Sequence, residues 1–216
     1  MKIYRNTVSD TLWETLMKLM KIDELEKFRL VGGTSLSLLI GHRVSVDIDL
    51  FTDAEYGTID FNKIIDAINS VFNFVETSQW SNNTLGNTCY IGATKKKLIK
   101  VDLFYTDPFV FPILNYKHLR LSQIEEIAAM KLEIVGNGGR KKDFWDIHEL
   151  TQYFTIEQMI HFYLKRYPYG HSKNEIISQL TNFEHADYDF DPICLQGKYW
   201  ELIKLDLIEI LTNKGK

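Results

Sequence analysis

The segment 46–52, VDIDLFT, constrains the fold more than any other, because it places two acidic residues inside an apolar run. Side chains of a β-strand point alternately to the two faces of its sheet. The apolar residues would therefore lie on one face, and Asp47 and Asp49 side by side on the other. Two carboxylates that close repel each other and raise the pKa of at least one of them. A strand that keeps both needs a cation, which could be a basic side chain such as Arg43 or a divalent metal ion.

A third acid, Asp102, occupies a similar apolar segment, KVDLFY, further along the chain. An Asp-x-Asp pair alone is most often part of a solvated strand face. If the strand of Asp102 neighbours that of Asp49, however, three carboxylates meet at one edge of the sheet. Carboxylate oxygens suit Mg²⁺ or Mn²⁺, and such a triad can hold the two metal ions used in phosphoryl transfer. The third acid therefore favours a metal site formed by Asp47, Asp49 and Asp102.

Two adjacent glycines precede the acidic strand and begin the segment GGTSLSLLIGH. We expect a helix that starts at Thr34 or Ser35 and ends at Gly41, because glycine often terminates helices. Glycine lets the backbone approach a ligand closely, and a helix N-terminus favours phosphate through its free N–H groups and its dipole. A glycine pair before a helix can also be a simple turn, and the segment is not a Walker A motif. Together with the acids it predicts a phosphate site at Gly32, Gly33, Thr34 and Ser35.

The order of the elements predicts an α+β fold with a mixed sheet. Helical patterns occur at 9–21, 34–42 and 60–72, and strand patterns at 28–33, 46–52 and 73–106. These strands indicate a sheet of four or five strands within residues 1–107. Residues 108–216 are helical, beginning with a capping box of Ser122 and Glu125. We therefore predict a core domain over 1–107 and a helical domain over 108–216, packed together near residues 106–121.

The composition excludes several classes of protein. Apolar residues make up 45% of the 216 residues, which excludes a disordered chain. The formal net charge of −4 gives no sign of nucleic-acid binding by the chain as a whole. The two cysteines, Cys89 and Cys194, lack the spacing of a zinc site. No apolar run reaches the roughly 20 residues that span a bilayer, so we expect no membrane partner and a soluble, cytoplasmic protein.

These segments together resemble the DNA polymerase β-type nucleotidyltransferases, and among them the AbiEii/AbiGii branch of bacterial abortive-infection toxins. The motifs span residues 30–150, and their combined spacing is specific although each piece alone is not. The residues that carry the resemblance are Gly32, Gly33, Thr34, Ser35 and Leu36, then Gly41, His42, Arg43 and Ser45, then Asp47, Asp49 and Phe51, and downstream Lys131, Arg140, Lys141, Asp143 and Asp146.

The resemblance implies a nucleotidyltransferase core with a mixed sheet, followed by a helical C-terminal part. It implies a metal-dependent transfer of a nucleotidyl group from a nucleoside triphosphate, with Mg²⁺ or Mn²⁺ as the cofactor. It also suggests the toxin of a toxin–antitoxin (abortive infection) system, with a cognate antitoxin as a partner. Acceptors in the wider family include RNA ends and protein hydroxyls. The acceptor therefore stays open, an RNA such as tRNA being one candidate.

The resemblance and the acid pattern together suggest roles for these residues and for Asp102, as hypotheses. The catalytic residues are Asp47, Asp49, Asp102, Lys131 and Asp146. The substrate-binding residues are Gly32, Gly33, Thr34, Ser35, Arg43, Arg140 and Asp143. Lys131 would neutralise the triphosphate, and of Asp143 and Asp146 one would orient Lys131 while the other contacts the base or the acceptor. The two acids share a helix face, which could also be a solvated face. Arg43 would bind phosphate or pair with Asp47.

Two other classes of function stay open on the sequence alone. A degenerate member of the same fold would bind a nucleotide or a partner without turnover, although the intact acid pair argues against it. A metal-dependent phosphohydrolase would use the same acids to activate water. A basic and aromatic segment, KRYPYGH at 165–171, is compatible with RNA contact but is more typical of a helix end and turn.

Overall fold

In the computed structural model, the described residues 2–95 and 97–212 form seven strands and eight α-helices. The strands are β1 (Arg29–Leu30), β2 (Ile48–Thr52), β3 (Phe74–Thr77), β4 (Gly86–Thr94), β5 (Lys97–Tyr105), β6 (Leu114–Tyr116) and β7 (Leu119–Leu121). The helices are α1 (Asp10–Leu19), α2 (Gly32–Ile40), α3 (Phe61–Val71), α4 (Ile124–Gly136), α5 (Lys141–Leu150), α6 (Ile156–Arg166), α7 (Lys173–Gln179) and α8 (Trp200–Thr212). The α+β class predicted from the sequence is confirmed.

The strands form one mixed sheet in the order β3-β4-β5-β2-β1-β7-β6. Strands β2 and β5 are parallel, as are β1 and β7, and the other neighbours are antiparallel. The sheet is larger than the four or five strands predicted. The two additional strands, β6 and β7, come from the segment that we expected to be a seam between two parts. The sheet therefore continues beyond residue 107, and the proposed division at 107/108 remains a prediction.

Side-chain caps begin helices α1, α3, α6 and α7. The hydroxyl of Ser9 accepts a hydrogen bond from the Leu12 amide, and Asp60 accepts from the amides that begin α3. The capping box predicted at Ser122 is wrong, because α4 begins at Ile124 after an N-cap residue, Gln123, whose side chain makes no capping bond. The amide of Ser122 instead donates to the carbonyl of Leu30 and extends the pairing of β7 with β1. Long-range strand pairing thus overrides the local helix signal.

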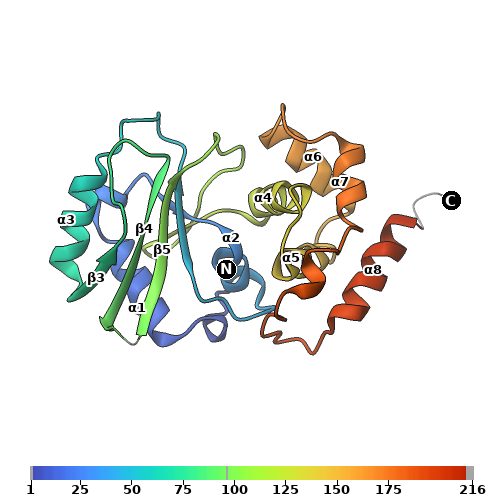
Figure 1. Ribbon diagram of the computed structural model, residues 1–216, viewed down its shortest axis with the longest axis horizontal. Helices are drawn as coiled ribbons and strands as arrows, with labels where there is room; N and C mark the ends of the chain where they lie inside the picture. Colours follow the sequence, from blue (N-terminus) through green and yellow to red (C-terminus); the bar gives the residue numbers. More distant parts are fainter. Residues whose placement is uncertain (1, 96, 213–216) are drawn as a thin grey trace.

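The buried apolar residues form two clusters. Helices α1 and α3 lie on one side of the sheet, and α2 and the C-terminal helices on the other (Figure 1). In the first cluster, Leu12, Leu16 and Leu19 of α1 and residues of α3 pack on the sheet. The second cluster joins Leu36 and Ile40 of α2 to the C-terminal helices, which gather on the other side in Figure 1. Helix α2 therefore lies between the sheet and the helical part. No helix of the described residues is long and apolar enough to cross a membrane.

Candidate active site

The parallel pairing of β2 and β5 brings the three predicted acids to one place. Asp49 and Asp102 are direct partners in this register, and Asp47 immediately precedes β2. All three line a cavity of about 180 Å³, which we call the acid cavity. The face that carries these acids is opposite to the buried side chains of Ile48 and Leu50, as the alternation of the strand requires.

Gly32 and Gly33 lie where a residue with a side chain would collide with Asp49 or with Arg43. Gly32 has φ +66°, and a Cβ atom there would lie 2.6 Å from Oδ2 of Asp49. A Cβ atom at Gly33 would overlap the guanidinium of Arg43. Helix α2 begins at Gly32, earlier than the predicted start at Thr34 or Ser35. The first amides of α2, which have no intrahelical acceptor, therefore lie near the carboxylate of Asp49.

Thr34 holds this turn from behind, and neither Thr34 nor Ser35 faces the acid cavity. The hydroxyl of Thr34 is hydrogen-bonded to the hydroxyl of Ser45 at 2.8 Å, and it donates to the main-chain carbonyl of Asp47. The side chain of Ser35 is fully buried. Neither residue lines the cavity, whereas Gly32 and Gly33 do. A phosphate at this turn would therefore meet backbone amides, because the Thr34 hydroxyl is bound elsewhere and the Ser35 hydroxyl is buried away from the cavity.

The carboxylates in the cavity carry unequal compensation. Burial, followed by the charges of Asp102 and Asp47, raises the pKa of Asp49 to about 6. Asp102 is better compensated, since Lys100 Nζ and Thr88 Oγ1 each lie 2.6 Å from its oxygens. Among the described residues, no group of three or more His, Cys, Asp or Glu side chains is already arranged to hold a metal ion. Lys131 and Lys142 lower the pKa of Asp49 only in part, and within the described part of the chain Asp47 and Asp49 have no ion pair like the one between Asp102 and Lys100.

The wall opposite the acids is a buried ion-pair cluster between α4 and α5. Nζ of Lys131 lies 2.6 Å from a carboxylate oxygen of Asp143 and 2.6 Å from one of Asp146. Burial opposes the charge of Lys131, but the two carboxylates together raise its pKa. Asp146 is fully buried and accepts hydrogen bonds from Arg43 Nε at 2.6 Å and Nη2 at 2.8 Å. The alternative that Arg43 pairs with Asp47 is therefore wrong.

Asp146 also accepts the fourth contact of this cluster, from His42 Nε2 at 2.7 Å. Burial alone would raise the pKa of Asp146, but the charges of Arg43 and Lys131 and the hydrogen bonds hold it well below the ordinary value. The side chain of Asp146 is fully buried among Lys131, Arg43 and His42 and does not line the acid cavity, so it is not placed to contact a base or an acceptor. Asp143, in contrast, lines the acid cavity.

A further cation, Lys142, enters the acid cavity although the sequence pattern does not single it out. The half-buried Lys142 and the exposed Arg140 both line the cavity. Burial, followed by the charges of Arg140 and Lys131, lowers the pKa of Lys142. Its neighbour Lys141 instead pairs with Asp191 at 2.9 Å. The sequence contains one indication that Lys142 has a function. A cation in the first turn of a helix interacts unfavourably with the helix dipole, so a lysine at this position suggests a role other than stabilising the helix.

A family model of the AbiEii nucleotidyl transferase toxins of type IV toxin–antitoxin systems matches residues 15–193. The chain belongs to the AbiEii toxin family. The match covers the glycine turn, the three acids and the cation-bearing helices, so the acid cavity lies within the AbiEii region of the chain.

One curated relative and two solved structures are similar to the chain over most of its length. The uncharacterized protein aq_aa25 of Aquifex aeolicus (strain VF5) is 26% identical, over 88% of this chain and 89% of its own. JHP933 of Helicobacter pylori has a TM-score of 0.62 at 16% identity, over 94% of this chain and 88% of its own. The nucleotidyltransferase toxin MenT4 of Mycobacterium tuberculosis H37Rv has a TM-score of 0.55 at 13% identity, over 91% and 81%. These structures show that the chain has the nucleotidyltransferase fold.

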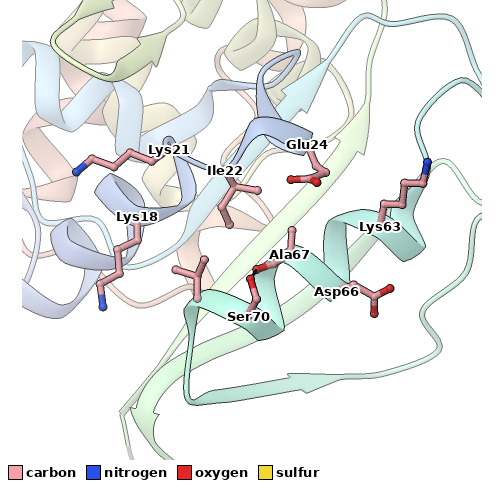
Figure 2. Close-up of a pocket in the computed structure, with 9 residues that line it drawn as sticks. Lys18, Lys21, Ile22, Glu24, Lys63, Asp66, Ala67 and Ser70 are labelled. Carbon is pink, nitrogen blue, oxygen red and sulfur yellow. Dashed lines mark hydrogen bonds between the residues drawn. The ribbon is translucent and has the colours of Figure 1, made fainter.

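A larger cavity of about 610 Å³ lies on the other side of the sheet, between the end of α1 and helix α3 (Figure 2). Its charged lining alternates Lys18, Lys21 and Lys63 with Glu24 and Asp66. None of the residues that carry the AbiEii resemblance reaches it. Since mixed charges on exposed helices are ordinary surface features, this cavity does not compete with the acid cavity as the candidate active site.

Proposed function

We propose that this AbiEii-family chain is a metal-dependent nucleotidyltransferase, which transfers a nucleotidyl group from a nucleoside triphosphate to a hydroxyl of an RNA or protein acceptor. The observation that carries the proposal is the composition of the acid cavity. Three carboxylates lie on one side, and the N-terminus of α2, Lys131, Lys142 and Arg140 border the same space. This arrangement combines groups that bind divalent metal ions with groups that bind phosphate.

The donor set of the acid cavity fits Mg²⁺ or Mn²⁺. Asp47 and Asp49 supply hard carboxylate oxygens. Burial and the neighbouring acids raise the pKa of Asp49 to about 6, although Lys131 and Lys142 act in the opposite direction. Asp102 would join them as a third ligand once it releases Lys100, with which it now pairs. When bound, the metal ions would neutralise charge on the reacting phosphate and favour attack by the acceptor hydroxyl.

The residues of this chain would divide the remaining work. The first amides of α2, at Gly32 and Gly33, would bind the β- and γ-phosphates through hydrogen bonds. Lys131, kept charged by Asp143 and Asp146, would neutralise the triphosphate as a point charge. Arg140 and Lys142 would add positive charge at the mouth of the cavity. The alternative role of Asp102 is that it keeps its contacts with Lys100 and Thr88, does not bind metal, and accepts the proton of the attacking hydroxyl.

Labelling with each of the four α-³²P nucleoside triphosphates tests the proposal. The full chain is incubated with Mg²⁺ and with total cellular RNA or a lysate, and transfer of label to either is measured. We expect Asp49→Asn and EDTA to abolish labelling. The matched control is Asp66→Asn, an exposed aspartate of α3 outside the acid cavity, which should label as well as the wild type. Labelling by Asp49→Asn at the wild-type rate would contradict the proposal.

The proposed activity would also account for toxicity. We infer that uncontrolled nucleotidyl transfer in the cytoplasm modifies an essential acceptor, and that a cognate antitoxin counters the effect. Induced expression should therefore arrest growth for the wild type and for Asp66→Asn, but not for Asp49→Asn at an equal protein level. Growth arrest by Asp49→Asn would mean that toxicity comes from binding and not from catalysis, as for a degenerate member of the fold.

A further inference from the structure

A second cavity, of about 340 Å³, adjoins the acid cavity, and we call it the outer cavity. Five residues line both, namely Arg43, Ser45, Asp47, Arg140 and Lys142. The acid cavity, at about 180 Å³, is smaller than the roughly 300–1,000 Å³ of cavities that enclose whole small ligands. It can hold the phosphates of a nucleotide, but the nucleoside must extend beyond it. The outer cavity offers continuous space for that extension.

The far wall of the outer cavity is the segment 189–193, in which Phe190 and Ile193 alternate with two acids that Lys141 holds, Asp189 and Asp191. Phe190 is 98% exposed and Ile193 is 67% exposed, and Val46, on the opposite wall, is 63% exposed. An aromatic ring this exposed packs against almost nothing within the chain. It leaves a free apolar face beside two cations, Arg140 and Lys142. An aromatic face close to basic side chains is the combination that binds single nucleotides and unpaired bases.

The segment that carries Phe190 is held by the active-site elements themselves. The amide of Val44 donates to the carbonyl of Ile193 at 2.9 Å, and the amide of Leu195 donates to the carbonyl of His42 at 2.9 Å. On the other side, Lys141 Nζ donates to Asp191 at 2.9 Å. The segment therefore forms a short bridge to the residues just before Asp47 and a link to the start of α5. The position of Phe190 relative to the acids is set by these contacts.

We propose, on the basis of the function proposed above, that the outer cavity binds a nucleobase stacked on Phe190. Arg140 and Lys142 hold the phosphate that adjoins its sugar, at the junction of the two cavities. The base belongs to the nucleoside triphosphate or to the end of an acceptor RNA strand, and both sources present the same chemistry to the cavity. Phe190 is then a residue that sets affinity and base preference, at a site separate from the metal-binding acids.

Binding measurements on the full chain test this proposal without requiring turnover. The ligands are inorganic triphosphate and each of the four nucleoside triphosphates with Mg²⁺, measured by calorimetry, and a fluorescent single-stranded RNA oligonucleotide, measured by polarisation. The variants are Phe190→Ala, Phe190→Trp, which keeps a stacking surface, and Tyr188→Ala. Tyr188 is a matched control, because it is 90% exposed, lies in the same segment and lines neither cavity.

We expect Phe190→Ala to weaken binding of the nucleoside triphosphates or of the RNA by about five- to a hundredfold, the effect of losing one base–aromatic stack. Inorganic triphosphate, which has no base, should bind unchanged, and Phe190→Trp and Tyr188→Ala should behave as the wild type. A loss confined to the nucleoside triphosphates assigns the base to the donor, and a loss confined to RNA assigns it to the acceptor.

Unchanged binding of both base-containing ligands to Phe190→Ala would overturn the proposal, as would an equal loss in Tyr188→Ala. A different result would refute the proposed function itself. In that case the wild type would bind neither inorganic triphosphate nor any nucleoside triphosphate. The two failures are therefore distinguishable in one set of titrations.

Discussion

Replacing Asp146 with asparagine should destabilise the chain strongly, although the new side chain has almost the same shape. Asp146 is fully buried and neutralises two buried cations, Arg43 at 2.6 Å and Lys131 at 2.6 Å. With a neutral amide in place of this carboxylate, only Asp143 would remain to balance both charges. Removing one partner of a buried ion pair costs about 3–5 kcal/mol, because the other charge stays buried and unpaired. We therefore expect the free energy of unfolding of Asp146→Asn to fall by about that amount.

Urea unfolding followed by circular dichroism measures this change directly. The matched control is Asp10→Asn, because Asp10 lies at the same 2.6 Å from Arg5 but its side chain is 94% exposed. An exposed pair contributes at most about 1 kcal/mol, so the control should lose no more than that. Equal and small losses in the two variants would refute the reasoning, since they would show that the cluster around Asp146 does not depend on its charge.

The same prediction can be checked a second way, from how the stability of the wild type and of Asp146→Asn changes with pH. The pKa of Asp146 is held well below its ordinary value in the folded chain, after burial and the opposing charges of Arg43 and Lys131 are combined. A lowered folded pKa contributes stability that is fully present above the unfolded pKa, about 4, and is lost as the pH falls through the folded pKa. The difference between the wild type and Asp146→Asn should thus be full above about pH 5 and shrink in more acidic solution.

Two further substitutions test the glycine turn and the cation that the sequence pattern does not single out. Gly32→Ala should lower the melting temperature by more than Gly57→Ala. Both glycines have positive φ, a conformation that alone costs a residue with a side chain about 1–2 kcal/mol. Only at Gly32 would the added Cβ atom also meet Asp49. Equal losses would remove the role assigned to that contact. Lys142→Ala should weaken binding of nucleoside triphosphates about tenfold or more, as expected for losing a charged hydrogen bond to phosphate. The control Lys141→Ala breaks the pair with Asp191 and should leave that affinity unchanged. Calorimetric titration of both variants measures the difference.

Much of the fold is predictable from short stretches of the sequence. The alternation in VDIDLFT places Asp47 and Asp49 on the face opposite Ile48 and Leu50, because side-chain direction in a strand depends only on position along it. The caps at Ser9 and Asp60 form within a few residues of chain. These features involve near neighbours, so they need no knowledge of how distant segments pack.

The tertiary structure decided what depends on segments far apart in the chain. Whether Asp102 joins Asp49 depends on β5 pairing with β2 and not with another strand. Asp146 finds Arg43 across 103 residues, and the pattern of α5 alone is equally compatible with a solvated face. Strand β7 pairs with β1 and removes the expected helix start at Ser122. The physical reason is the same throughout. Local backbone preferences are worth fractions of a kcal/mol per residue. Leaving a buried charge unpaired costs several kcal/mol, and strand pairing adds up over many residues, so long-range contacts outweigh the local preferences.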